Sequence, residues 1–442
     1  MNKFRLVSFA ICVGMAFVSP SFALDLSLND AVEKIMHESH DLKKAAANLA
    51  KAEASLDAAN ANRWFKLEGT ASYMNLVNVE RPLDSRNFEL PPELGGLLPE
   101  ALKDKEISFE IPDNIFMAGL SLTQPLYTFG KIGNAVKSVK SAIKMAESSQ
   151  ELTRREVRYA ATDLYWTAKM TDEIVALAER DLKNARSARN SLTAAGRANR
   201  SNLLKIESDI ATKEINVSDA KFNRDTAHRM LKIMAGINVD EELTLTESFP
   251  KTFESIETKK LENTPQWDIL GEQVNMYERL ARSKRAGAYP TLAATASYNY
   301  MSMSGDIGHM FDESGSQSAT WGVALQVPIF SGGLNRANAT VEAMNAEAAR
   351  QDLDQAKKIT TEQYDNAIKS YNHLRGNLAT LENARDLAAK TYALSQNRFA
   401  SGQTSAVELA DVSAGLYQLD MALLNTKYKI LMSAESIRKL GE

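Results

Sequence analysis

The sequence predicts a mostly helical chain that also contributes four strands to a β-barrel in a membrane. Three observations lead to this fold class: a strand–proline–glycine stretch occurs twice, a very long helical run follows each copy, and no helix after the N-terminus is apolar enough to cross a bilayer. The stretches are residues 120–130 and 323–333, and the runs are 131–195 and 334–400. A helix of more than about sixty residues would be about 100 Å long, which suits a tube of antiparallel coiled coils better than a compact enzyme.

Residues 1–23 have the pattern of a secretory signal peptide. Lys3 and Arg5 supply a positive start, residues 6–18 an apolar core, and Ala23 ends a small-residue cleavage site. The apolar core is about thirteen residues long, shorter than the roughly 20 that a membrane-spanning helix needs. We therefore expect the mature chain to lie beyond the inner membrane.

Charge and cysteine content exclude several classes of function. The one cysteine, Cys12, lies within the signal segment, so the mature chain has no disulfide and no thiol chemistry. Without Lys3 and Arg5 the chain has 50 basic and 56 acidic residues, a net charge of −6. This balance argues against a nucleic-acid partner.

The mature chain is predicted to be a tandem duplication. At a constant offset of 225, residues 41–75 align with 266–300 without a gap, and the sequence TASY occurs at both Thr70 and Thr295. The proline–glycine stretches pair at an offset of 203, and Gly196 pairs with Gly402 at 206. The predicted domains are a first structural repeat over 24–236, an equatorial segment over 237–264 and a second repeat over 265–442.

Helix starts and a heptad pattern support long, closely packed helices. Ser27 with Asp30 forms a capping-box pattern at the first helix, and Thr264-Pro265 is an N-cap followed by proline at the first helical position. Leucine and alanine each recur every seven residues in the first helix, as in a coiled-coil seam. These positions are Leu42, Leu49, Leu56, Ala45, Ala52 and Ala59.

Four strands are predicted, two in each repeat, at 65–79, 115–124, 291–301 and 320–327. In the last strand the odd positions from Trp321 to Val327 are apolar, and the even positions from Thr320 to Gln326 are small or polar. A barrel wall between lipid and water needs this period of two, although a sandwich strand shares it. Aromatic residues that crowd the strand ends favour the barrel. They are Trp64, Phe65, Tyr127, Phe129, Tyr289 and Phe330.

Four strands are too few to close a barrel, since about eight is the smallest number that closes. An open sheet in lipid would leave its edge groups unpaired, at several kcal/mol per group. We therefore expect an oligomer that shares one barrel, with two, three or four copies left open by the strands alone. The loops at 81–112 and 304–318 are expected to face outward.

The duplicated order resembles the TolC-like outer-membrane efflux channel family over the whole mature chain. The proline–glycine stretches, the helix starts at His40-Asp41-Leu42-Lys43 and Pro265-Gln266-Trp267-Asp268, and the turns after Gly196 and Gly402 carry the resemblance. It implies a homotrimer with a trimeric barrel in outer-membrane lipid and an α-helical tube through the periplasm. At the tip of the tube, a periplasmic adaptor protein and an inner-membrane pump or transporter would join it, for efflux or type I secretion.

The same resemblance assigns roles at the periplasmic tip. Phe399 takes the place of a gating tyrosine, and Glu408 and Asp411 fall where acidic rings line the closed end. Three copies would bring six carboxylates around one axis, where they attract cations and repel one another. An alternative for Glu408 is a capping box with Ser405. The adaptor would contact the tip at Gly196, Gly402 and Thr404.

The sequence departs from the family pattern at two positions of the tip. Thr404 stands where an arginine is expected and Asn202 where its acidic partner is expected, so that inter-subunit salt bridge is absent. Arg197 and Arg200, beside the first turn, are candidates to substitute for it by reaching Glu408 or Asp411 of a neighbouring copy.

Two possible metal sites are set aside. His37 and His40 have the wrong spacing for the HExxH motif, and the methionines near residue 301 with His309 and Met310 are read as packing residues rather than soft-metal ligands. No motif supports catalysis, a cofactor or a bound metal. The alternative to an exit duct is a periplasmic coiled-coil adaptor, which would share the signal segment and heptads without lipid-facing strands.

Overall fold

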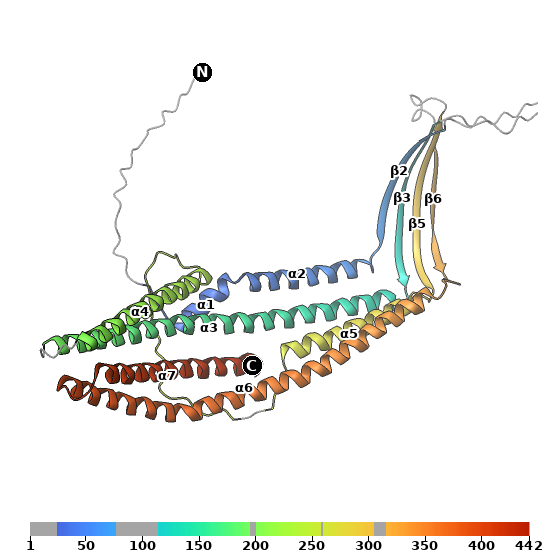
Figure 1. The fold of residues 1–442 in the computed structure, drawn as a ribbon. Helices are drawn as coiled ribbons and strands as arrows, with labels where there is room; N and C mark the ends of the chain where they lie inside the picture. The colour runs from blue at the N-terminus through green and yellow to red at the C-terminus, as the bar shows by residue number, and fades with distance from the viewer. Residues whose placement is uncertain (1–23, 77–113, 195–199, 258–259, 305–314, 442) are drawn as a thin grey trace, which may run out of the picture. The chain divides into compact units, whose positions relative to one another are not determined.

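The computed structural model describes residues 24–76, 114–194, 200–257, 260–304 and 315–441, and Figure 1 shows their fold. The chain forms two compact units. The first contains Met1–Leu49, Ala146–Ile269 and Asp352–Glu442, and the second contains Ala50–Met145 and Leu270–Gln351. Each unit therefore takes parts from both halves of the sequence, and helices α2, α3, α5 and α6 run through the boundary between the units.

The element bounds reproduce the duplication. In chain order the elements are β1 (Leu24–Leu26), α1 (Leu28–Glu38), α2 (His40–Ala61), β2 (Lys66–Asn75), β3 (Asn114–Tyr127), α3 (Lys131–Ala194), α4 (Arg200–Met234), β4 (Leu243–Leu245), α5 (Pro265–Ala286), β5 (Thr291–Ser304), β6 (Ser316–Gln326), α6 (Leu334–Ala400) and α7 (Ala406–Gly441). Helix α2 shifted by 225 residues matches α5 at both ends, and the starts of α3 and α6 differ by 203 and those of α4 and α7 by 206. These are the offsets that the sequence predicts.

The predicted helix starts are confirmed, with one difference. Ser27 Oγ accepts from Asp30 N at 3.2 Å, and Thr264 Oγ1 accepts from Trp267 N at 3.3 Å. The first helix, however, is broken at Ser39, whose extended ψ of 118° stops α1. Ser39 Oγ then accepts from Leu42 N at 3.3 Å and begins α2.

The heptad seam of α2 is the half-buried stripe of an otherwise exposed helix. The six predicted seam residues, Leu42, Ala45, Leu49, Ala52, Leu56 and Ala59, are all partly buried. No residue of α2 is fully buried. The sequence pattern therefore identified the packing face of this helix.

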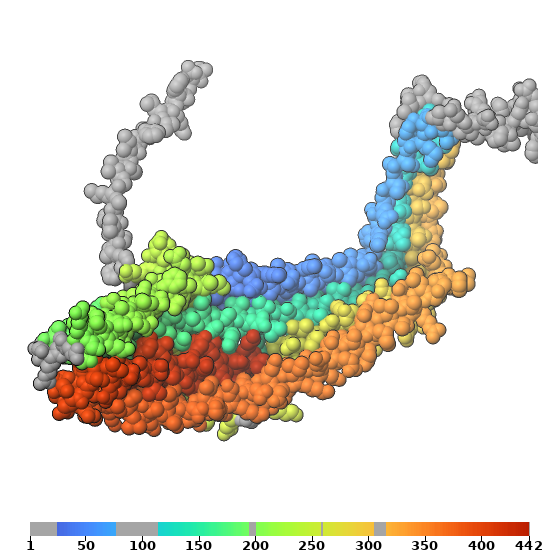
Figure 2. All heavy atoms as spheres, viewed as in Figure 1, coloured from blue at the N-terminus to red at the C-terminus, as the bar shows by residue number. Residues whose placement is uncertain are grey.

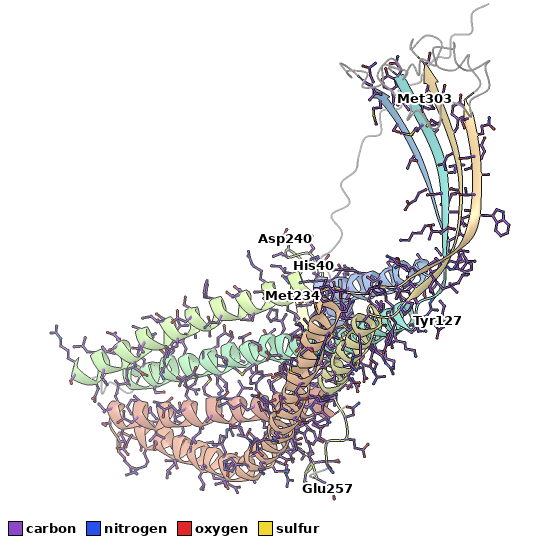
Figure 3. All side chains as sticks on the ribbon, turned by 90° about the vertical axis from the view of Figure 1, so that its right-hand side faces the viewer. His40, Tyr127, Met234, Asp240, Glu257 and Met303 are labelled. Atoms are coloured by element: carbon purple, nitrogen blue, oxygen red, sulfur yellow. The ribbon has the colours of Figure 1, made fainter. Side chains whose placement is uncertain are left out.

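In the second unit, β2, β3, β5 and β6 form one antiparallel sheet in the order β2-β3-β5-β6. Figures 1 and 2 show the strands as a single layer, and Tyr127 and Met303 mark its two ends (Figure 3). Four predicted strand ends were wrong. β2 ends at Asn75 instead of residue 79, and residues 77–79 lie outside the described residues. β3 continues through Pro125 and has a bulge before Tyr127. Proline is tolerated at a bulge because the ladder there needs no hydrogen bond from its nitrogen. β5 continues to Ser304 and β6 begins at Ser316, since their neighbours supply partners that a single-strand pattern does not show.

Among its described residues, the first unit has three hydrophobic clusters. Two of them are described here, and the third belongs to the candidate site below. β1 pairs in parallel with β4 over a cluster that includes Leu26, Tyr165 and Leu231. Tyr165 Oη donates to Leu26 O at 3.1 Å and accepts from Glu247 N at 3.1 Å. Further along the chain, Tyr371 Oη donates to Glu254 O at 2.7 Å and holds residues near 254 against α6. The segment predicted as equatorial, 237–264, thus contains the short strand β4, and the partner strand β1 was not predicted.

No described helix combines the length and the apolar character that a transmembrane helix requires.

Gly236 ends α4 in a left-handed conformation, and its replacement provides a first prediction. Its φ is +66°, and a Cβ there would lie 2.9 Å from Glu38 Cγ. Gly236 N bonds to Ile233 O and Ile237 N to Lys232 O, the pattern of a Schellman cap. We expect Gly236→Ala to lower the free energy of unfolding by about 1–2 kcal/mol, the cost of a left-handed non-glycine residue, measured by urea titration with circular dichroism.

Gly376→Ala is the matched control. Gly376 lies within α6, and a Cβ there would meet nothing within 4 Å. This change should raise stability by about 0.5–1 kcal/mol, because alanine loses less backbone entropy in a helix. Shifts of the same sign in both variants would contradict the assignment of Gly236.

Candidate functional site

The candidate site lies where α3 approaches α4 and where α6 turns into α7, in the first unit. The second turn has a defined geometry. Gly402, with φ +80°, ends α6 in a Schellman cap in which Gln403 N bonds to Arg398 O at 2.7 Å. Ser405 Oγ then accepts from Glu408 N at 3.2 Å and caps α7. The Ser405 half of the capping-box alternative is therefore present in the structure.

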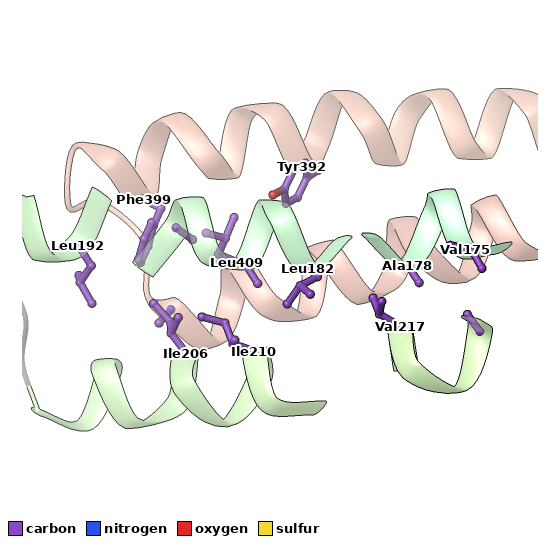
Figure 4. Close-up of a cluster of buried hydrophobic side chains, with 14 residues drawn as sticks. Val175, Ala178, Leu182, Leu192, Ile206, Ile210, Val217, Tyr392, Phe399 and Leu409 are labelled. Carbon is purple, nitrogen blue, oxygen red and sulfur yellow. The ribbon is translucent and has the colours of Figure 1, made fainter. Parts of the chain in front are cut away.

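A hydrophobic cluster contributed by all four helices lies behind this turn (Figure 4). Phe399 belongs to it and is only 7% exposed. In Figure 4 it lies among Leu192 of α3, Ile206 of α4 and Leu409 of α7. Within one chain Phe399 thus packs the core of the tip, and its role as a gate stays a prediction.

The predicted charged residues lie on the surface of the tip. Glu408 and Asp411 are three residues apart on α7, on the face opposite the buried Ala406 and Leu409. Arg200, the first residue of α4, is also exposed. None of the three forms an ion pair with another described residue of this chain, so each remains available to a neighbouring molecule.

The other predicted tip residues are placed only in part. Thr404 is half-buried, and its Oγ1 is buried without a hydrogen-bond partner among the described residues. Gly196 and Arg197 lie outside the described residues. Their roles as an adaptor contact and as a substitute cation remain predictions.

Further from the turn, an ionic group that the sequence analysis missed ties α3, α4 and α7 together. Lys213 of α4, whose side chain is 7% exposed, donates to Asp181 Oδ2 of α3 at 2.5 Å. Ser413 Oγ of α7 donates to Asp181 Oδ1 at 2.7 Å. Asp209 lies 3.7 Å from the same ammonium group. Both oxygens of Asp181 therefore accept hydrogen bonds, one from α4, the antiparallel partner of α3, and one from α7 of the α6–α7 pair.

A second ionic group has the opposite arrangement. Asp420 of α7 is 6% exposed and accepts from Arg385 Nε of α6 at 2.7 Å. Its other oxygen accepts from Arg180 of α3. Arg180 and Asp181 are consecutive on α3, and Ser413 and Asp420 are seven residues apart on α7, so both groups connect the same two helices.

The two groups occupy nearly equivalent positions of the duplication with their charges exchanged. Shifting Asp181 by 203 gives position 384, next to Arg385, and shifting Lys213 by 206 gives 419, next to Asp420. In the first repeat the longer helix, α3, carries the acid and α4 the base. In the second repeat the longer helix, α6, carries the base and α7 the acid. A sequence signal for the first pair exists. Lys213 interrupts a buried stripe at helical spacing, formed by Ile206, Ile210, Val217 and Ala220.

Burial alters the acid–base properties of this region. Burial raises the pKa of Asp209 above its ordinary value, and the attraction of Lys213 only partly offsets it. Burial likewise raises the pKa of Tyr392, which is further raised by the charge of Asp181. Nearer the β1–β4 pair, burial and a hydrogen bond to Asp163 raise the pKa of Tyr428 to about 12. Among the described residues, no three His, Cys, Asp or Glu side chains are grouped as a metal site would require.

Long antiparallel helix pairs, an open four-stranded sheet and a tandem repeat define the class of an outer-membrane exit duct. The sequence pattern of the outer membrane efflux protein family matches residues 31–236 and 261–441, and the chain belongs to this family. It is located in the outer membrane, extends into the periplasm and serves as an exit duct.

Individual relatives agree with this assignment. The chain is 23% identical to the alkaline protease secretion protein AprF of Pseudomonas aeruginosa over 342 residues, which is 73% of this chain and 69% of AprF. The fold is similar to that of VceC of Vibrio cholerae, with TM-score 0.75, 17% identity and coverage of 94% and 96% of the two chains. It is also similar to CmeC of Campylobacter jejuni, with TM-score 0.75, 18% identity and coverage of 93% and 85%.

Removal of the Lys213 charge tests the first ionic group. We expect Lys213→Met to lower the free energy of unfolding by about 3–5 kcal/mol, because Asp181 would remain buried without its cation. Urea titration followed by circular dichroism measures the loss. Arg186→Gln is the control, since Arg186 pairs with Glu214 at 2.6 Å with both side chains about half exposed, and exposed pairs contribute about 0–1 kcal/mol. Similar losses in the two variants would contradict the structural role of Lys213.

Asp209 gives a pH prediction. Because its folded pKa is raised, its contribution to stability is present below the unfolded value of 3.8 and is lost as pH rises through the folded pKa. Asp209→Asn should therefore stabilise the protein relative to wild type more at pH 7 than at pH 4, as measured by thermal melting. Thr212→Ala, a neighbouring change without a titrating group, should show a pH-independent difference. A wild-type advantage that grows with pH would refute the sign.

Proposed function

We propose that three copies of the chain assemble into one sealed duct, in which each copy supplies four strands to a shared β-barrel and four long helices to a periplasmic tube. The observation that carries this proposal is the register of the sheet, because directly paired residues lie on the same face. One face is apolar over most of its length, apart from Gln124, and turns polar toward the Met303 end of the sheet at Asn75, Asn114, Ser302, Ser304 and Gln317. Its apolar residues are Leu67, Ala71, Tyr73, Phe116, Ala118, Leu120, Leu122, Leu292, Ala294, Ala296, Tyr298, Ala319, Trp321, Val323 and Leu325.

The opposite face is polar or small over the same length and turns apolar toward the Met303 end, at Met74, Ile115, Met117, Met301 and Met303. Its polar residues are Lys66, Glu68, Thr70, Ser72, Ser121, Thr123, Thr295, Ser297, Asn299, Ser318 and Thr320. Trp321 on the apolar face is 89% exposed. An apolar surface of this extent in a single chain indicates contact with lipid or another protein, and the polar face suits an aqueous interior. A periplasmic adaptor would have no use for such a sheet.

The edges of the sheet support assembly. Within the described chain, β2 and β6 each pair on one side only. Unpaired strand edges in hydrocarbon are costly, so a closed arrangement with other copies is favoured.

Exposed apolar residues on the helices support the same conclusion. On α4 they recur along one side, and on α6 two of them are one heptad apart. They are Leu204, Ile215, Phe222, Met230 and Ile233 on α4, and Leu387 and Leu394 on α6. Such stripes are typical of helices that pack against a further helix. Adjacent copies in a ring would supply that helix.

At the tip, the proposed closed state is built from residues that one chain leaves exposed. Glu408 and Asp411 of three copies would form acidic rings, with Arg200 and Arg197 of neighbouring copies as counter-charges. Phe399 would pack the constriction from behind, and the turn at Gly196, Gly402 and Thr404 would meet the adaptor. An inner-membrane pump or transporter would drive transport, and the duct itself would catalyse no reaction. The similarity to AprF supports secretion beside efflux as its use.

Neutralising the acidic pair tests both the duct and its tip. Purified wild-type protein in planar bilayers should conduct, and Glu408→Gln/Asp411→Asn should lower the permeability ratio of potassium to chloride by about twofold or more, since rings of one sign concentrate counter-ions. The control is Glu207→Gln/Asp225→Asn, two exposed carboxylates on α4 with the same change in net charge.

The outcomes separate the two parts of the proposal. A wild-type protein that forms no trimer and no conducting pore would refute the duct. An unchanged permeability ratio in the tip variant would remove Glu408 and Asp411 from the pore while leaving the duct in place.

A further inference from the structure

Two adjoining cavities lie in the first unit, one between α3 and α7 and the other between α1, α3 and α7, and the proposed function assigns no role to their lining. Their volumes are about 280 Å³ and 350 Å³, at the lower end of the range of about 300–1,000 Å³ for small-molecule sites. Arg154, Arg158, Glu435 and Arg438 line both cavities. These four residues form the wall that the cavities share.

The lining carries an excess of positive charge. Five cations line the two cavities, against three carboxylates. The cations are Arg154, Arg155, Arg158, Arg438 and Lys439, and the carboxylates are Glu33, Glu151 and Glu435. An anion bound there would reduce the repulsion between neighbouring guanidinium groups.

Glu435 organises the arginines of the shared wall. It is 8% exposed, and its Oε2 accepts from Arg438 at 2.8 Å, while Arg158 Nε lies 3.8 Å from its Oε1. The carboxylate of Glu435 therefore holds Arg438 by a hydrogen bond and attracts Arg158 electrostatically, which keeps both guanidinium groups at the shared wall.

Arg154 and Arg158 retain donors for a ligand. They are four residues apart on α3 and therefore share one face of the helix. Their contacts with Glu151 at 3.9 Å and Glu435 at 3.8 Å are ion pairs beyond hydrogen-bond distance, and neither guanidinium makes a hydrogen bond to another described residue. Two such forks in proximity are suited to bidentate contact with a phosphate or carboxylate.

The larger cavity also has an apolar side. Leu28, Val32 and Met36 of α1 line it at a spacing of four residues, and each is half-buried. Apolar side chains on one wall and guanidinium groups on the other fit a molecule with an anionic head and a hydrocarbon tail.

We propose that these two cavities bind a small anionic amphiphile. A phosphate or carboxylate head group is held by Arg154 and Arg158, and a short hydrocarbon chain lies against Leu28, Val32 and Met36. The head group is what a free acyl or alkyl anion and an acidic lipid have in common. This proposal rests on the lining of the two cavities and does not depend on the proposed function.

Calorimetric titration of the full chain in nanodiscs tests the proposal, with hexyl phosphate as the probe and empty nanodiscs as the blank. We expect saturable binding with a dissociation constant below about 1 mM. Arg154→Gln and Arg158→Gln should each weaken binding about tenfold, as the loss of a charged hydrogen bond does. The control Arg186→Gln, an exposed arginine on the same helix outside both cavities, should leave the affinity unchanged.

A second variant keeps the test decisive if the arginine variants fold poorly. Met36→Ser should weaken hexyl phosphate by about fourfold for each CH₂ no longer buried and leave methyl phosphate unaffected. Wild-type binding that is absent, or equal for hexyl phosphate and hexanol, would overturn the proposal. So would arginine variants that alter trimer stability but bind hexyl phosphate as wild type does, since the cluster would then be a protein interface.

A final arm identifies the source of the ligand. Dihexanoyl phosphatidic acid that binds more tightly than hexyl phosphate supports an acidic lipid, and weaker binding supports a single-chain anion.

Discussion

The constraint on which the structure depends is the cost of leaving the outer edges of the four-stranded sheet, at β2 and β6, without hydrogen-bond partners. The chain provides a four-stranded sheet with one mainly apolar and one mainly polar face, and within the described residues β2 and β6 each lack a neighbour on the outer side. A single copy can satisfy neither these edges nor the apolar face. The duplication gives each repeat the same contribution, which is one pair of strands and one pair of long helices.

The long helices meet a different requirement, which is to remain together over many turns with few large side chains. Alanine-rich seams allow close approach, and the hydrophobic cluster around Phe399 and Tyr392 joins all four helices. Two buried ionic groups then fix the pairing. Asp181 and Asp420 each accept from one helix of their own pair and from one helix of the other pair. Charges buried in this way are stable only with all their partners in place.

Much of this architecture was predictable because it repeats. The offsets of 225, 203 and 206 match the observed starts of α5, α6 and α7, and caps such as Thr264-Pro265 mark helix starts locally. Features that depend on distant partners were missed. β1 is three residues long and exists only because Leu243–Leu245 lies beside it, and β3 passes through Pro125 because β5 accommodates a bulge. At the tip, the sequence identified Glu408, Asp411 and Arg200, which are exposed. It did not identify Asp420, because the partner that allows this carboxylate to be buried, Arg180, lies 240 residues away in the chain.

The exchanged polarity of the two ionic groups limits how the chain can change over generations. A substitution at Asp181 or Lys213 alone leaves a buried charge without its counterpart, so drift at these positions has to proceed by coupled replacements. The two halves arose as copies, yet they have settled on opposite solutions at nearly equivalent sites.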